Sequence, residues 1–244
     1  MQVLRQRLRR SYFYFSTMPN LFRMHELLFL MRHLKIRKDD RLLDVACGIG
    51  VYSDWLANKA ACVVGFDLSY DSILLANCIS KENTFYYRCN AEEISHPDST
   101  FDIVVSICVL EHLNDSKKAL REMFRVLKPG GQLLITVDSL ENINSKEFIE
   151  FHRKFCLVNK YFTVDTILKE LEEAGFEIKD IKPILTSVLS SALCRLAFKI
   201  MKWPLIFIVY SLVMFPLSLI SDMIASDKRS GIIICSYALK PLTA

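Results

Sequence analysis

The stretch from Arg41 to Asp67 constrains the fold of this chain more than any other. It consists of an apolar run at 42–46, a glycine-containing turn at 47–50, a helix-compatible segment at 51–59, a second apolar run at 62–66, and Asp67. Mostly apolar runs of this length, here bounded by a charge before the first run and by glycine after it, are typical of strands that are buried on both faces. The order strand, turn, helix, strand and acid predicts a crevice that binds a nucleotide-like ligand.

The residue types of this stretch suit such a ligand. Gly48 and Gly50 lack a Cβ and let the backbone approach a bound molecule, and the turn opens a helix whose free N–H groups face it. An acid after the second strand, here Asp67, can accept both hydroxyls of a ribose. A dinucleotide fold would have a third glycine where Ser53 stands, and it would not need Asp44 inside the first strand. Asp44 could instead meet a cationic group, such as the amino group of an amino acid.

The segment Asp44-Val45-Ala46-Cys47-Gly48-Ile49-Gly50 resembles the first motif of the class I S-adenosylmethionine-dependent methyltransferases, of the type 11-like kind. Ala46 stands where the family more often has its first glycine. Three further segments match that family in the same order: Asp67, the stretch 101–113 with Phe101-Asp102 and Glu111-His112, and the string 125–131, RVLKPGG. The resemblance covers residues 40–183 and 231–240.

The resemblance implies a donor site for S-adenosylmethionine. Asn90 takes the place of an acid that lies beside the adenine in the family; its amide can still bond the adenine edge, or it can be an ordinary helix cap. The cofactor-binding residues expected on this basis are Asp44, Ala46, Cys47, Gly48, Gly50, Asp67, Leu68, Asn90, Ala91, Glu92, Ile107 and Cys108.

Two histidines are candidate catalytic residues. His152 lies in the segment 138–161, where the family holds its acceptor substrates, and it could take a proton from an acceptor hydroxyl. The alternative for His152 is an exposed helix histidine. His112 could accept a proton or cap its loop, and a single histidine is more often structural. No cluster of histidines and acids has metal-ligand spacing, so no metal is expected.

The first 40 residues are predicted to be a basic helical cap on the fold, with His25, Leu28 and Met31 facing inward. Arginines beside Tyr12-Phe13-Tyr14-Phe15 also suit an anionic membrane surface. No apolar h-region is present, so no signal peptide is expected; an organelle transit peptide is a further alternative.

Residues 185–225 are an insertion between the sixth and seventh predicted strands. The stretch 203–221 carries no charge and nearly meets the length of about 20 residues that crosses a bilayer. Both flanking strands belong to one sheet, so a single crossing is excluded. Before it, a polar stripe is predicted to face away from an apolar side, the pattern of a helix that lies in a membrane surface. The stripe is Ser187, Ser191, Arg195, Lys199 and Lys202, and the apolar side is Leu189, Ala192, Leu193, Leu196, Ile200 and Met201. Pro204 and Pro216 are expected to bend the chain. A soluble lid or a dimer arm is the alternative.

Composition adds three limits. A formal net charge of +4 is too small to indicate nucleic-acid binding. The 8 cysteines include no C-x-x-C pair, so we expect reduced thiols of a cytosolic chain. The apolar fraction of 52% is high, and the insertion accounts for the excess.

The sequence therefore predicts an α/β protein with a Rossmann-like seven-stranded mixed sheet, helices on both faces and an apolar helical insertion. The expected parts are a basic cap at 1–40, a methyltransferase domain at 41–184 and 231–240, and a membrane-interfacial insertion at 185–225. The expected function is methyl transfer from S-adenosylmethionine to a membrane-held acceptor on the cytoplasmic side of a membrane: a lipid-linked glycan, a quinone or another lipid. The alternatives are a methyltransferase for a soluble small molecule and a non-catalytic cofactor-binding scaffold. The oligomeric state stays open.

Overall fold

The structure is a computed structural model that describes residues 21–78, 80–201, 203–225 and 229–242. The aromatic run 12–15 and the arginines around it lie outside the described residues, as does Lys202 of the predicted polar stripe. The predictions made for those positions are therefore not tested.

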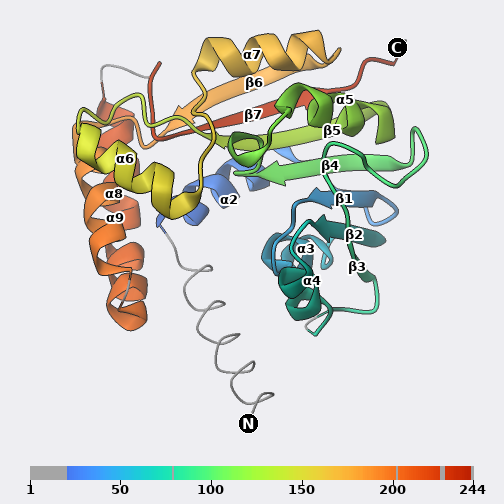
Figure 1. Cartoon of the computed structure of the whole chain (residues 1–244), viewed down its shortest axis with the longest axis horizontal. Coiled ribbons are helices and arrows are strands. Elements are labelled where there is room, and N and C mark those ends of the chain that lie inside the picture. The colour runs from blue at the N-terminus through green and yellow to red at the C-terminus, as the bar shows by residue number, and fades with distance from the viewer. Residues whose placement is uncertain (1–20, 79, 202, 226–228, 243–244) are drawn as a thin grey trace.

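A seven-stranded sheet forms the centre of the molecule (Figure 1). Its strands are β1 (Arg41–Val45), β2 (Cys62–Asp67), β3 (Thr84–Arg88), β4 (Phe101–Ile107), β5 (Leu127–Asp138), β6 (Glu177–Ile184) and β7 (Ile233–Leu239). Their order is β3-β2-β1-β4-β5-β7-β6, and β7 runs antiparallel to both of its neighbours. The predicted fold class, with a mixed seven-stranded sheet, is confirmed.

The strand order reverses between β1 and β4, which pair in parallel through Leu43 and Val104. The chain leaves β1 toward β2 on one side, and it leaves β4 toward β5 on the other. In open α/β sheets a crevice opens at such a point, outside the carboxyl ends of the strands. The predicted ligand-binding turn follows β1 and therefore lies at this crevice.

Helices cover both faces of the sheet. Helices α5 (Ser116–Val126) and α7 (Val164–Glu173) bury Leu120, Met123 and Leu171 against one face. Helices α2 (Leu21–His33), α3 (Val51–Leu56) and α8 (Val188–Ile200) cover the other, and α4 (Tyr70–Asn77) packs beside β3. Figure 1 shows α5 and α7 on one side of the sheet, and α3 and α4 at the far end from α8.

Side-chain caps of the types that are preferred at a helix start begin two of the helices. The side chain of Ser69 accepts a hydrogen bond from the backbone N–H of Ser72, and Thr163 accepts one from Thr166. These caps fix where α4 and α7 begin, and α4 begins directly after the acid that ends β2.

The described part of the N-terminal cap is α2, and its predicted inward face is only partly correct. His25 is buried, but Leu28 and Met31 are 42% and 56% exposed. The face that packs on the sheet consists of Leu21, His25, Glu26, Phe29 and Leu30. The prediction failed because it excluded a charged residue from the interior, and Glu26 is buried among hydrogen-bond donors that come from other elements.

The insertion forms two helices, α8 and α9 (Pro204–Ile224), that pack against each other. The chain breaks at Trp203–Pro204 as expected. The second expected bend does not end the helix, because α9 continues through Pro216. Within a long helix a proline removes one hydrogen bond and can be accommodated by neighbouring packing. By length and apolar composition alone, Leu205–Ile224 could cross a membrane, and 17% of it is buried.

Polar contacts attach the insertion to the domain. His25 Nε2 of α2 lies 2.7 Å from Ser218 Oγ of α9, and the Asn142 side chain donates to the carbonyl oxygen of Leu185 at 2.6 Å. Within the insertion, the Ser190 hydroxyl donates to Asp222 Oδ1 at 2.6 Å. The predicted polar stripe of α8 is therefore divided: Ser187 and Ser191 are buried, whereas Arg195 and Lys199 are exposed. Of the apolar side, Leu189 and Leu196 are exposed and lie on the solvent side with these cations, and Ala192 is exposed as well.

Candidate functional site

The turn after β1 has the backbone that its glycines allow. Gly48 and Gly50 have φ angles of +55° and +82°, in the left-handed region that favours glycine. A Cβ at Gly50 would lie 2.7 Å from Tyr86 Oη, so that position admits no side chain. A Cβ at Gly48 would meet nothing within 4 Å. The space over Gly48 is therefore open to a ligand.

Ala46 shares this left-handed backbone, with a φ of +53°. The family resemblance has a glycine at this position, so the departure has a conformational cost. For an alanine the left-handed region costs about 1 kcal/mol.

Asp67 at the end of β2 holds the turn in place. Its Oδ2 accepts a hydrogen bond from the backbone N–H of Gly48 at 2.9 Å, and its Oδ1 accepts one from Ser69 at 2.8 Å. The carboxylate is half-buried and retains lone pairs beyond these two bonds. It can therefore position the turn and accept ligand hydroxyls.

The other predicted adenine-side residues follow β2 and β3 along the same edge of the sheet. Leu68 is 60% exposed and Ala91 is buried. Asn90 is exposed, and its Oδ1 accepts the N–H of Glu92 at 3.0 Å, while Glu92 Oε1 accepts the N–H of Asp115. Asn90 therefore forms a local turn with its amide N–H₂ group still available.

A cavity of about 230 Å³ opens over the turn. It is lined by six of the predicted cofactor residues: Asp44, Ala46, Cys47, Gly48, Ile107 and Cys108. Gly50, Asp67, Leu68, Asn90, Ala91 and Glu92 lie outside its lining. Half of the predicted cofactor residues thus line one cavity, at the carboxyl ends of β1 and β4. The other half lie outside this cavity, in the turn and along the same edge of the sheet.

Asp44 is the buried acid of this cavity, with 3% of its surface exposed. The hydroxyl of Ser53 donates a short hydrogen bond to its Oδ2. The pKa of the Asp44 carboxyl is raised to about 7, mainly by burial. The hydrogen bonds from Ser53 lower this pKa, and the charge of Asp67 raises it. A cationic ligand group beside it would favour the ionised form.

Arg23 and Glu26 of α2 form an ion pair beside the cavity, and nothing in the sequence around them indicates these roles. Arg23 lines the cavity, and its guanidinium donates to Glu26 Oε2 at 3.0 Å. Glu26 is fully buried and also accepts from Tyr52 at 3.1 Å, Cys108 at 3.0 Å and Thr136 at 2.8 Å. Their spacing of three residues puts both on one side of the helix, but only the fold shows which side faces the crevice.

A second cavity, of about 390 Å³, adjoins the first and shares Arg23 and Cys108 with it. The insertion forms one wall, through Ala197, Phe198 and Met201 near the end of α8 and Phe207 of α9. Helix α6 (Lys146–Cys156) forms another. Since the two cavities meet at shared residues, molecules bound in each would be neighbours.

Both predicted catalytic histidines line the second cavity. His152 is buried, against the alternative of an exposed helix histidine, and its Nδ1 lies 3.0 Å from the Tyr161 hydroxyl. Burial lowers the pKa of His152 to about 4. His112 is exposed, and its Nδ1 lies 3.2 Å from the carbonyl oxygen of Leu157, which fits a loop contact.

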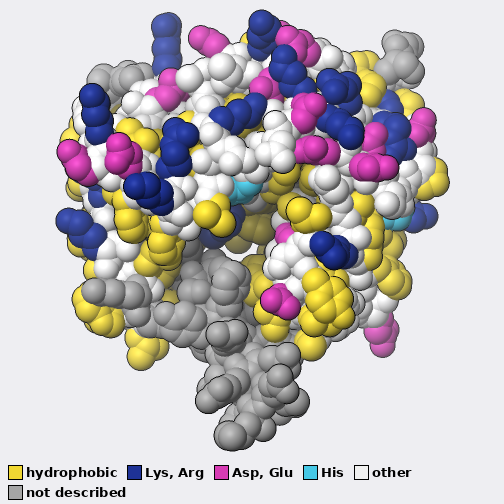
Figure 2. Space-filling model, in the orientation of Figure 1, with side chains coloured by type: hydrophobic (Ala, Val, Ile, Leu, Met, Phe, Trp, Pro, Cys, Tyr) yellow, Lys and Arg dark blue, Asp and Glu magenta, His cyan; other side chains and the backbone are white. Residues whose placement is uncertain are grey.

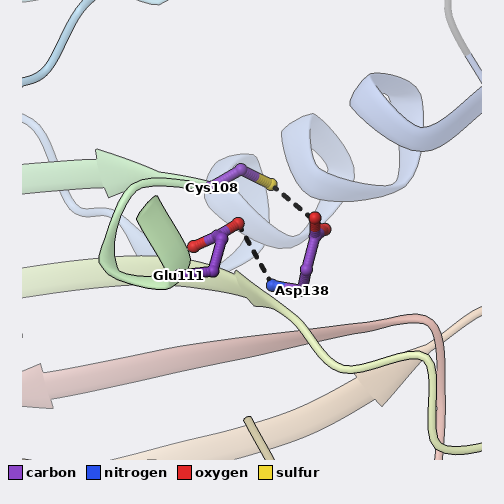
Figure 3. Close-up of side chains that lie close together, drawn as sticks. All are labelled: Cys108, Glu111 and Asp138. Carbon is purple, nitrogen blue, oxygen red and sulfur yellow. Dashed lines mark hydrogen bonds between the residues drawn. The ribbon is translucent and has the colours of Figure 1, made fainter. Parts of the chain in front are cut away.

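Three further acceptors gather at the carboxyl ends of β4 and β5 (Figure 3). Atoms of Cys108, Glu111 and Asp138 lie within 4.8 Å of one another. The side chains of Cys108 and Asp138 point toward each other, at 4.0 Å from Sγ to Oδ1, and Glu111 Oε1 accepts the backbone N–H of Asp138 at 3.2 Å. Burial raises the pKa of the Cys108 thiol well above its usual range. A thiol in this state is a poor metal ligand, so we treat the group as a hydrogen-bonded cluster.

The fold and the site are those of a class I S-adenosylmethionine-dependent methyltransferase, and the chain belongs to this class. Residues 43–135 match the family model described as a methyltransferase domain. The prediction of this family and of its methyl donor is confirmed.

Known proteins add more distant similarities. A probable S-adenosylmethionine-dependent methyltransferase of Mycolicibacterium smegmatis is 30% identical over 65% of this chain and 60% of its own length. The ubiquinone/menaquinone biosynthesis C-methyltransferase UbiE of Pasteurella multocida is 39% identical over 41% of this chain and 40% of its own. The chain therefore spans about half the length of the curated relatives it matches. Phosphoethanolamine N-methyltransferase 2 of Haemonchus contortus, solved with S-adenosylmethionine, shares the fold at 22% identity, with a TM-score of 0.67 over 89% of this chain and 52% of that one.

The residues present fit the donor. Its amino acid end needs an acid and a cation close together, and Asp44 and Arg23 line one cavity. The open space over Gly48 leaves room beside the turn.

Proposed function

We propose that the chain transfers a methyl group from S-adenosylmethionine to an amphiphilic acceptor held at a membrane surface. One observation carries this proposal: the cavity at the glycine turn adjoins a second cavity that the insertion encloses, and the two share Cys108. A donor in the first and an acceptor in the second would lie side by side, which is the geometry that methyl transfer requires.

In the donor cavity and along the edge of the sheet beside it, each residue has one role. Asp67 accepts the ribose hydroxyls, Asp44 accepts from the amino group, and Arg23 binds the carboxylate. The remaining predicted residues contact the donor through shape or backbone: Ala46, Cys47, Gly48 and Gly50 at the turn, Leu68, Asn90, Ala91 and Glu92 toward the adenine, and Ile107 and Cys108 below the reacting end. When bound, S-adenosylmethionine supplies an electrophilic methyl group.

The acceptor cavity has an aromatic wall and a polar end. Phe22, Phe155, Phe198 and Phe207 contribute rings. The polar groups are those of Arg23, Glu26, His112, His152 and Asp138. Such a lining suits a flat, mostly apolar molecule with one ionisable group. Relatives named for ubiquinone and menaquinone biosynthesis make a quinol-type acceptor the first to test.

The outer face of α9 supports a membrane surface as the acceptor's source. Its large apolar side chains are at least 47% exposed: Leu205, Ile206, Val209, Leu212, Val213, Leu217, Ile220, Met223 and Ile224. Figure 2 shows hydrophobic side chains at the α8–α9 end and also around α3 and α4, while charged side chains cover the side of α5 and α7. A soluble monomer rarely exposes so large an apolar patch.

The insertion would lie in the interface, because β6 and β7 flank it. Ile184 at its start pairs with Ile233 just after it, so the chain enters and leaves at one place. A single crossing would separate these strands. We therefore propose that α9 lies with its outer face in the lipid, on the cytoplasmic side of a membrane.

Flotation with lipid vesicles tests this placement. Val209→Lys with Val213→Lys should weaken binding to vesicles that contain phosphatidylglycerol by about tenfold or more, since two exposed apolar side chains are replaced by charges. Leu74→Lys with Phe85→Lys, at exposed apolar positions on α4 and β3, is the control. Equal vesicle binding by both pairs would favour the soluble alternative, in which the insertion is a lid.

Mass spectrometry of lipid extracts tests the acceptor. Extracts from cells that lack the gene are incubated with the purified full chain and isotope-labelled S-adenosylmethionine. A labelled lipid that accumulates only with the wild-type chain is expected. Binding of S-adenosylmethionine with no labelled product in lipid or aqueous fractions would favour the non-catalytic scaffold.

A further inference from the structure

We propose that Asp138, rather than His152, takes the proton from the acceptor. The inference rests on the proposed function, and it assigns a catalytic residue that sequence reasoning did not find. Asp138 is the last residue of β5, so its carboxylate is positioned by the sheet and opens into the acceptor cavity. It lies next to Cys108, which lines both cavities. The carboxylate is therefore at the junction where a donor and an acceptor would meet.

The carboxylate of Asp138 is buried but weakly bonded. Its described contacts are Cys108 Sγ at 4.0 Å and His152 Nε2 at 3.7 Å, both longer than an ordinary hydrogen bond. Glu26, by contrast, accepts from four side chains. Of the two acids that line the acceptor cavity, Asp138 therefore retains more capacity than Glu26 to accept a proton from a bound molecule.

The surroundings of Asp138 set its basicity. The titratable and charged groups that face it are Arg23 and Glu26 from α2, Cys108, Glu111 and His112 from the segment after β4, His152 and Cys156 from α6, and Tyr161. Burial raises the pKa of the Asp138 carboxyl to about 7; the charge of Glu26 raises it further and Arg23 opposes this. A base is most effective when its pKa is near the working pH.

His152 is less suited to be the base. Burial lowers its pKa to about 4, so the ring is neutral and accepts a proton poorly at neutral pH. Its Nδ1 is already engaged by the Tyr161 hydroxyl at 3.0 Å, and its Nε2 faces Asp138. We assign His152 a positioning role, in which Tyr161 orients the ring beside the carboxylate.

The step balances with Asp138 as the base. An electron pair of the acceptor forms the bond to the methyl carbon, and the sulfur keeps the electron pair of the broken carbon–sulfur bond. The attacking pair is a lone pair of a hydroxyl oxygen or, for a quinol methylated on carbon, the π pair of the ring carbon beside the ionised hydroxyl; in that case the ring C–H proton then moves to this oxygen. The proton of the acceptor X–H group passes to the Asp138 carboxylate. One positive and one negative charge are lost together, so the products are a neutral thioether, a methylated acceptor and a neutral carboxyl group.

The test compares Asp138→Asn, Asp138→Glu and His152→Asn in the full chain, with a short-chain demethylmenaquinol in detergent as the probe. At saturating S-adenosylmethionine, where the effect of Asp44 on donor binding does not limit the rate, the wild-type rate should rise with pH up to about 7 and then level off. Asp138→Asn should lower the rate by about 100-fold or more and remove this dependence, and Asp138→Glu should restore part of the rate. His152→Asn should lose less and keep the pH profile. Asp138→Asn with more than a tenth of the rate and the wild-type profile would overturn the proposal.

A second measurement separates this proposal from the proposed function. Carbon NMR of the chain with labelled aspartate carboxyls, without any donor or acceptor, should show a carboxyl that titrates between pH 6 and 8 and is missing in Asp138→Asn. Asp44→Asn identifies the other carboxyl with a raised pKa. If the wild-type chain binds S-adenosylmethionine but does not methylate the probe, the assignment of a quinol as the acceptor fails. The NMR titration of the Asp138 carboxyl then tests by itself whether this group can act as the base. A carboxyl of Asp138 that titrates below pH 5 overturns its role as the base.

Discussion

Glu26 on α2 accepts a hydrogen bond of 2.8 Å from the hydroxyl of Thr136 on β5, 110 residues later in the chain. The bond connects the N-terminal helix to the carboxyl edge of the sheet. Arg23, Tyr52 and Cys108 donate to the same carboxylate. Helix α2 is thus part of the wall between the two cavities.

We expect Glu26→Ala to lower the free energy of unfolding by about 3–5 kcal/mol, because it leaves Arg23 and two buried hydroxyls without their acceptor. Chemical denaturation measures this loss. Glu150→Ala, at an exposed position of α6, should change stability by no more than about 0.5 kcal/mol. A loss below about 1 kcal/mol for Glu26→Ala would show that the buried network contributes little.

Asp44 should make donor binding depend on pH. Its folded pKa of about 7 lies above the ordinary value of 3.8, so the folded chain holds a proton that the unfolded chain releases as pH rises from 4 to 7. S-adenosylmethionine binding should therefore weaken below pH 7, by up to about tenfold per pH unit. Calorimetry at several pH values measures this, and Asp44→Asn should bind weakly with no such dependence.

The raised pKa of Asp44 means that its ionised form destabilises the fold at pH 8. We therefore expect Asp44→Asn to stabilise the donor-free chain at that pH by about 1–3 kcal/mol, because no buried charge remains. A variant that is less stable than wild type at pH 8 would contradict the raised pKa.

Ala46→Gly should stabilise the chain by up to about 1 kcal/mol, because glycine adopts a φ of +53° without strain. Thermal unfolding measures the shift. Ala57→Gly, at a right-handed position with a φ of −60°, is the control and should be neutral or destabilising. An equal loss for both variants would mean that the backbone of Ala46 is not strained.

His25 should make the chain less stable in acid. Burial lowers its folded pKa to about 4 from 6.5, so its contribution is complete above pH 6.5 and is lost as pH falls toward 4. The midpoint of thermal unfolding should decrease from pH 7 to pH 5, and His25→Gln should reduce this decrease.

Much of the fold follows from local patterns. The apolar runs, the glycine turn and the caps at Ser69 and Thr163 each act over a few residues, so the strands and the turn could be placed from sequence. The acid pair Asp44 and Asp67 follows from the same short stretch.

The rest depends on contacts between distant segments. Glu26 and Asp138 reach the site only through tertiary packing, and nothing in their neighbouring residues indicates it. The burial of Ser187 was missed for the same reason: a hydroxyl on a helix can face water, or it can accept a hydrogen bond from a second helix, as Ser187 does from Ser221.

Donor binding tests the central claim most directly, and calorimetric titration of the purified chain with S-adenosylmethionine measures it. The wild-type chain and Asp71→Ala, an exposed acid on α4, should bind with a dissociation constant below about 1 mM, whereas Asp67→Ala should lose at least about tenfold in affinity while remaining folded by circular dichroism. Absence of binding by the folded wild-type chain, or full affinity in Asp67→Ala, would contradict the placement of the donor over the turn at Gly48.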